Sequence, residues 1–201
     1  MNLIRGLQSM VVALLLGPGL PAGLHAEVVH SENPENGLRG WRFTDGDIGI
    51  ELIQRLPDQT RALFMQHEFS REVIEELALS CMFQTIIRNT GKSETDQPVA
   101  IDLRQWHMQH AGKETGIVIK DTWLDAWSEA DAGPAATLVV RWGMFPTQQE
   151  FLPGDYNWGL TAYGIPPGSV FDLDVAWREG KQTRSGRITG IQCAPDVDRL
   201  K

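Results

Sequence analysis

The second half of the chain alternates hydrophobic and polar residues, which is the pattern of strands with one buried face. The alternation recurs in three stretches, over residues 138–144, 156–162 and 171–177. Turn-forming residues separate these stretches, and Arg178 to Lys181 is typical of a hairpin connection. We therefore predict antiparallel strands from residue 135 to the neighbourhood of Cys193.

The first half of the chain mixes this pattern with a helical one. Short strands are predicted over 48–52, 83–88, 99–103 and 117–119. Pro57 suits the first turn of a short helix, and Ser70 is a good N-cap for a second. Apolar residues then recur at helical spacing from Val73 to Cys81. Asp121 is expected to cap another short helix, which carries Trp123 and Trp127.

Together these elements predict a mainly β fold, an immunoglobulin-like antiparallel β-sandwich with a short helical insertion near the N-terminus. The sandwich is expected to be a single domain over 47–194, with the insertion at 57–81. Residues 27–46 are predicted to be a loosely ordered lead-in, and 195–201 a frayed C-terminal tail. Trp142, Trp158 and Trp177 fall on alternating apolar positions, so we expect them in the core.

The first 26 residues have the layout of a secretory signal peptide. Arg5 supplies a positive charge, Met10 to Leu16 is an uninterrupted apolar run, and Ala26 offers a small residue for cleavage. The apolar run is far shorter than the roughly 20 residues that a membrane-spanning helix needs. We therefore expect a cleaved leader, no membrane span, and a periplasmic or secreted mature chain.

Charge excludes two classes of ligand for that mature chain. The leader holds one of the 18 Lys and Arg residues and none of the 26 Asp and Glu residues, which leaves a net charge of −9. An acidic domain repels phosphate backbones and anionic membrane surfaces. We therefore expect no nucleic acid partner.

The chain has two cysteines, Cys81 and Cys193, and both lie after the leader. An even number of thiols in an oxidising compartment indicates a disulfide. A redox or metal-binding pair is the alternative, but no Cys-x-x-Cys spacing supports it. We predict a structural Cys81–Cys193 disulfide that fastens the helical insertion to the last strand.

Histidine and methionine gather in two short segments. His107, Met108 and His110 lie within four residues, and Met65 and His67 form a second pair. Imidazole and thioether are ligands that suit copper, so copper is the metal this set favours. If residues 106–110 are extended, His107 points away from Met108 and His110, whereas on a helix the two histidines share a face. No cofactor other than copper is indicated.

The sequence contains no recognisable catalytic motif. It has no Gly-x-Ser-x-Gly element, no His-Glu-x-x-His zinc motif and no phosphate-binding glycine loop. We therefore expect a non-enzymatic accessory or assembly protein that binds a protein partner in the cell envelope. A copper-binding or copper-delivery protein is the alternative, and a carbohydrate-binding module with exposed tryptophans is a third hypothesis.

Overall fold

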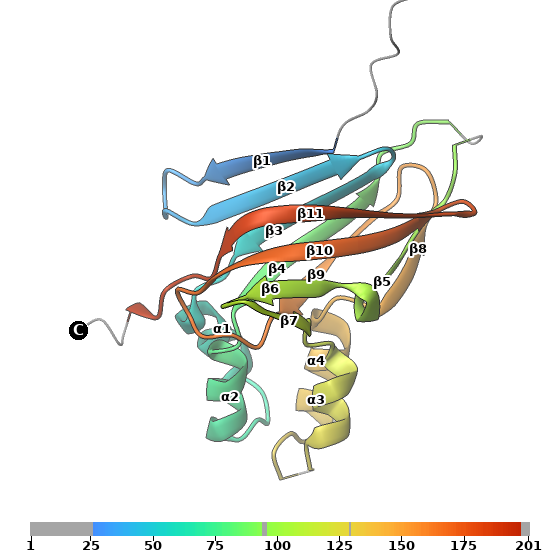
Figure 1. Ribbon diagram of the computed structural model, residues 1–201. Coiled ribbons are helices and arrows are strands. Elements are labelled where there is room, and N and C mark those ends of the chain that lie inside the picture. The colour runs from blue at the N-terminus through green and yellow to red at the C-terminus, as the bar shows by residue number, and fades with distance from the viewer. Residues whose placement is uncertain (1–25, 94–95, 129, 198–201) are drawn as a thin grey trace, which may run out of the picture.

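A computed structural model describes residues 26–93, 96–128 and 130–197, and they form two antiparallel sheets with four α-helices at one end (Figure 1). The leader predicted over 1–26 lies, apart from Ala26, outside the described residues. The first sheet has the order β1 (Glu27–Glu32), β2 (Arg39–Asp45), β3 (Ile48–Gln54), β4 (Met82–Asn89) and β9 (Tyr156–Ala162). No helix in the described part of the chain has the length and apolar character that a membrane crossing requires.

The second sheet is built around one long strand, β10 (Val170–Glu179). Its neighbour on one edge is β11 (Gln182–Gln192). Its other edge is shared by β6 (His107–His110) and β5 (Val99–Asp102), which the 3-10 turn η1 (Leu103–Gln105) separates. The outer strands are β7 (Lys113–Gly116) beside β6 and β8 (Gln148–Phe151) beside β5. The mainly β, sandwich-like fold expected from the sequence is thus confirmed.

The core lies between the two sheets and follows the predicted alternation. On β3, Ile48, Ile50 and Leu52 are fully buried, because every second side chain faces the other sheet. From the second sheet, Trp177 meets Phe43 edge to face, with ring centroids 5.8 Å apart. The apolar pattern of the sequence therefore identifies the inner faces of β3 and β10.

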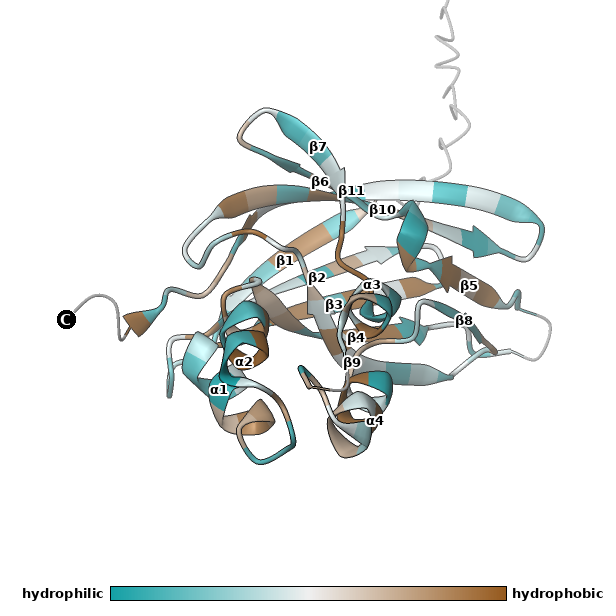
Figure 2. Ribbon diagram, turned by 90° about the horizontal axis from the view of Figure 1, so that it is seen from below, coloured by the Kyte–Doolittle hydropathy of each residue, from teal (hydrophilic) through white to brown (hydrophobic). Residues whose placement is uncertain are grey.

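The predicted helical insertion is present between β3 and β4. It contains α1 (Pro57–Phe64) and α2 (Arg71–Ala78). Ser70 caps α2 as expected, because its side chain accepts a hydrogen bond of 3.3 Å from the backbone N–H of Val73. The other two helices, α3 (Lys120–Ala126) and α4 (Pro134–Gly143), lie on the opposite side of the same end of the molecule (Figure 2).

An ion cluster around Arg61 ties the two helices of the insertion to the end of the chain. The Arg61 guanidinium lies 2.7 Å from Asp58, 2.9 Å from Glu75 and 3.0 Å from Asp196. Asp196 is only 6% exposed. The prediction of a frayed tail from residue 195 is therefore wrong for Asp196, because a buried carboxylate holds its place against Arg61. Residues 198–201 lie outside the described range.

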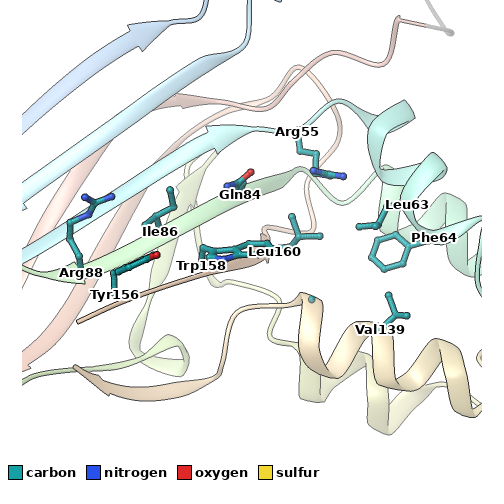
Figure 3. Close-up of a pocket in the computed structure, with 11 residues that line it drawn as sticks. Arg55, Leu63, Phe64, Gln84, Ile86, Arg88, Val139, Tyr156, Trp158 and Leu160 are labelled. Atoms are coloured by element: carbon teal, nitrogen blue, oxygen red, sulfur yellow. The ribbon is translucent and has the colours of Figure 1, made fainter. Parts of the chain in front are cut away.

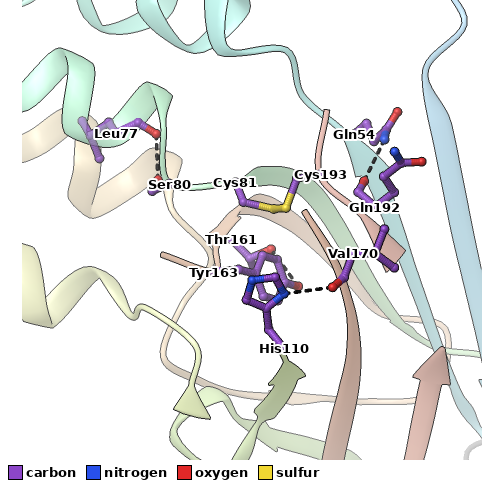
Figure 4. Close-up of a disulfide and its surroundings, with 10 residues drawn as sticks. All are labelled: Gln54, Leu77, Ser80, Cys81, His110, Thr161, Tyr163, Val170, Gln192 and Cys193. Carbon is purple, nitrogen blue, oxygen red and sulfur yellow. Dashed lines mark hydrogen bonds between the residues drawn. A yellow bond between two sulfur atoms is a disulfide. The ribbon is translucent and has the colours of Figure 1, made fainter. Parts of the chain in front are cut away.

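The predicted disulfide between Cys81 and Cys193 is confirmed (Figure 4). Cys81 stands between α2 and β4, and Cys193 directly follows β11. The bond therefore joins the helical insertion to the second sheet, and both cysteines are buried. Since 112 positions separate them, the bond closes a long loop of the unfolded chain.

Three stretches differ from the sequence prediction. Residues 138–144 were predicted as a strand, but most of them belong to α4, which Pro134 opens at its first turn. A short apolar run cannot by its period alone be distinguished from a helix segment. Residues 27–46 are also not a loosely ordered lead-in, because β1 and β2 pair there as a hairpin whose turn is the Asn33–Gly37 stretch. Of the strand predicted over 117–119, a single bridge from Val118 to Ala162 is present.

Removing the disulfide should destabilise the protein without changing its fold. For the double variant Cys81→Ala, Cys193→Ala we expect the free energy of unfolding to fall by about 4 kcal/mol, because the unfolded chain regains the freedom of a long loop. Urea denaturation of the oxidised wild type and the variant measures the difference. Wild type unfolded with excess reductant is the control and should match the variant; an unchanged midpoint in the variant would contradict the structural role.

Candidate binding groove

The outer face of strands β4 and β9 forms the floor of an open groove. In the register of this pair, Tyr156 lies opposite Arg88, Trp158 opposite Ile86, and Leu160 opposite Gln84. The intervening residues of β4, such as Thr85 and Ile87, face the core and are fully buried. Strand alternation therefore sends the six opposed side chains to one outward surface.

Helices form the two walls of this groove. Figure 2 shows the α1–α2 pair and the α3–α4 pair on either side of a gap below the sandwich. Leu63 and Phe64 of α1 line one wall, while Val139 and Gly143 of α4 line the other (Figure 3). The groove has a volume of about 530 Å³.

Gly159 lets the α4 wall approach the floor closely. A Cβ atom at this position would lie 2.7 Å from the backbone N and Cα of Phe145, so no larger residue fits without a shift. The Phe145 N–H donates a hydrogen bond of 2.8 Å to the Leu160 carbonyl oxygen. The residues that follow α4 are therefore fixed to β9, and the position of the wall is set by backbone contact.

Large apolar side chains are exposed in the groove and on its rim. Tyr156 is 68% exposed and Trp158 is 60% exposed on the floor. On α4, Leu138 is 54% exposed and Trp142 is 81% exposed, one turn apart and next to the lining residue Val139. Exposed apolar side chains that gather on one face mark contact surfaces more often than scattered ones do.

The charged residues that line the groove are two arginines, Arg55 and Arg88. No aspartate or glutamate is among its described lining residues, although the chain as a whole has more acidic than basic residues. Burial lowers the pKa of Arg55 from its usual value. The groove thus combines an apolar floor with a local excess of positive charge.

The sequence prediction of buried tryptophans is wrong for Trp142 and Trp158 and correct for Trp177, which is 2% exposed. Trp158 does alternate with its neighbours, but its phase places it on the outer face of β9. Trp142 is in a helix, where alternation has no meaning. The sequence contains more tryptophan than one core needs, and this excess could have indicated that some of the tryptophan rings are exposed.

The histidines and methionines proposed as copper ligands lie in different environments. Residues 107–110 form strand β6, so of the two geometries considered the extended one is realised. Met108 is packed in the core at 4% exposure. The ring Nδ1 of His110 lies 2.9 Å from the Val170 carbonyl oxygen (Figure 4), and that of His107 lies 3.1 Å from the Gln105 carbonyl oxygen.

The second pair, Met65 and His67, follows α1, and Met65 is 68% exposed. Across the described ranges, no three or more His, Cys, Asp or Glu side chains gather closely enough to hold a metal ion. Copper binding by His107, Met108, His110, Met65 and His67 stays a prediction, which titration of the mature protein with Cu(I) would test.

Comparison with known proteins does not identify a relative that explains the groove. No protein-family model matches the chain, and no curated protein matches it. Among solved structures, the chain is similar to a crystal structure from Bacillus subtilis described as a putative lipoprotein, at 8% sequence identity and a TM-score of 0.32. The match covers 83% of this chain but 34% of that protein, so this chain spans about a third of its length. A likeness this weak carries no argument about function.

A pair of tryptophan substitutions compares the exposed ring of Trp142 with the buried ring of Trp177. Trp142→Ala should leave the free energy of unfolding within about 0.5 kcal/mol of wild type, because the ring is exposed. Trp177→Ala should lower it by about 3–5 kcal/mol, because a fully packed ring leaves a cavity. Urea denaturation followed by circular dichroism measures both, and a large loss for Trp142→Ala would mean that this ring is packed.

Proposed function

We propose that this chain is an exported, non-catalytic accessory protein that binds a protein partner through the groove over β4 and β9. The observation that carries the proposal is the exposure of large apolar side chains both on the floor, at Tyr156 and Trp158, and on α4 beside the lining residue Val139. Tyr156, Trp158 and Trp142 belong to the residue types that dominate the energy of protein interfaces, as do the two lining arginines.

The extent of the surface favours a protein over a small molecule. A small ligand would be enclosed by the floor and the two helical walls, and would leave the rim residues in water. Trp142 and Leu138 lie on that rim and face outward. A partner that covers both the groove and the rim buries all of these side chains, which is the arrangement of an interface core with apolar anchors.

Two further features support the location and the class of the protein. The disulfide is of the kind found in oxidising compartments, and the leader-like first 26 residues are typical of export to the periplasm or beyond. The absence of a recognisable catalytic motif in the sequence supports a binding role. The immunoglobulin-like character of the sandwich is part of the same proposal, but it concerns the scaffold alone, and the binding role rests on the groove.

Site-specific photo-crosslinking in living cells tests the proposed function. A photoreactive amino acid in place of Val139, in the groove wall, should give one discrete adduct of higher mass. The matched control carries the same amino acid in place of Lys181, in the exposed turn between β10 and β11, and should give none. The Val139 adduct should disappear when Trp158→Ala is added.

Equal adducts from the two positions, or a Val139 adduct that survives Trp158→Ala, would contradict binding through the groove. The adduct band is digested and identified by mass spectrometry, which establishes whether the captured molecule is protein. A glycan in that band would instead support the carbohydrate-binding hypothesis.

A further inference from the structure

Arg55 lies at the edge of the groove, and among the described residues it has no carboxylate within ion-pair distance. It directly follows β3, and its side chain reaches toward the lining residues of α1 and β4 (Figure 3). Its Nε atom is buried and has no hydrogen-bond partner. One long hydrogen bond of 3.4 Å runs from Nη2 to the Gln59 carbonyl oxygen, and no described carboxylate forms an ion pair with Arg55.

Arg61, six residues later, differs from Arg55. The lack of a paired carboxylate is therefore a property of the Arg55 site and not of every arginine in this region. Arg61 has a side chain that is 17% exposed, and it is surrounded by three carboxylates. The chain therefore does compensate a partly buried guanidinium where it serves the fold. Leaving a buried donor of a charged group unsatisfied costs free energy, so Arg55 carries a cost in this fold that the paired Arg61 does not.

Arg88 adds a second positive charge on the same side of the groove. Its nearest carboxylate is Glu51 at 3.8 Å, and Glu51 is also 3.0 Å from the Arg42 guanidinium. Two guanidinium groups thus share one carboxylate, which leaves an excess of positive charge beside Arg88. The β3–β4 side of the groove is cationic, whereas the α4 side presents Val139 and the exposed Leu138 and Trp142.

We propose that the occupant of the groove is an amphipathic segment of the partner protein that carries acidic side chains along one edge. Its apolar face lies on Trp158, Leu160 and α4, and its aspartate or glutamate side chains bind Arg55 and Arg88. Arg55 follows β3 and Arg88 lies on the floor strand β4, and two cations at separate points of the groove fit acidic side chains along a segment better than one terminal carboxylate. The proposal rests on the proposed function and specifies the chemistry of the partner.

Selection from a random peptide library displayed on phage tests this directly, with the mature disulfide-bonded protein as bait. Enriched peptides should combine large apolar residues with aspartate or glutamate. A synthetic copy of the best peptide should bind Arg55→Gln at least about tenfold more weakly than wild type, since a charge-assisted hydrogen bond is lost. The matched control is Arg178→Gln, an exposed arginine on β10 outside the groove, which should bind as wild type does.

A double-mutant cycle separates the role of Arg55 from the role of the groove. Changing the peptide's acidic residue to its amide should weaken binding to wild type by a similar factor, but should have little further effect on Arg55→Gln. Enriched peptides that are apolar without acidic residues, and whose binding depends on Trp158 but not on Arg55, would overturn this inference and leave the proposed function intact.

Two other outcomes would contradict more than the role of Arg55. If no enriched peptide depends on Trp158, both the inference and the proposed function fail. If the protein instead binds vesicles of phosphatidylglycerol and phosphatidylethanolamine through Trp142, and no peptide competes, the groove serves a lipid surface and the acidic segment is contradicted. Circular dichroism of Arg55→Gln and Trp158→Ala should show the wild-type fold, because Trp158 is 60% exposed and the Arg55 side chain makes one long hydrogen bond and no ion pair with the described residues. Arg55→Lys, which keeps the charge, should retain part of the affinity.

Discussion

The groove depends on the way the helical insertion is fastened to the sandwich. Two covalent or ionic links meet near the end of the chain: the Cys81–Cys193 disulfide and the pairing of Arg61 with Asp196. Both join the insertion to residues that follow β11, which belongs to the other sheet. An eight-residue helix such as α1 has little stability of its own. The position of the α1 wall beside the groove therefore depends on these two links and on the packing of α1 against α2.

The α4 wall is positioned by backbone contact with β9 and not by a disulfide or an ion pair of the described residues. The residues after α4 lie against β9 because Gly159 has no side chain to prevent it. With both walls fixed from the sandwich, helices cover Leu160 and Met82 at one end of the outer face of β4 and β9, whereas Tyr156 and Trp158 at the other end remain exposed. Hydrophobic burial favours covering such a surface. A partner that fills the groove gains that free energy without first paying to reorganise the walls.

The sequence predicted the scaffold better than the site. Alternation identified β3, β9 and β10, and the cap at Ser70 identified α2, because these signals are local. The pairing of Cys81 with Cys193 followed from there being two cysteines. The groove could not be predicted in this way, since it depends on which face of β9 is outward and on α4 being a helix. Trp158 and Trp142 carry the same sequence signal as a core residue, and only tertiary structure separates them from Trp177.

Hydroxyl-radical footprinting of the protein in the intact cells that produce it and after purification tests the central claim most directly. The account predicts strong oxidation of Tyr156, Trp158 and Trp142 in the purified protein and protection of all three in the cells. Leu152, which is 60% exposed outside the groove, should be oxidised equally in both states. Equal oxidation of the three groove aromatics in the two preparations would contradict the claim that a partner covers this surface.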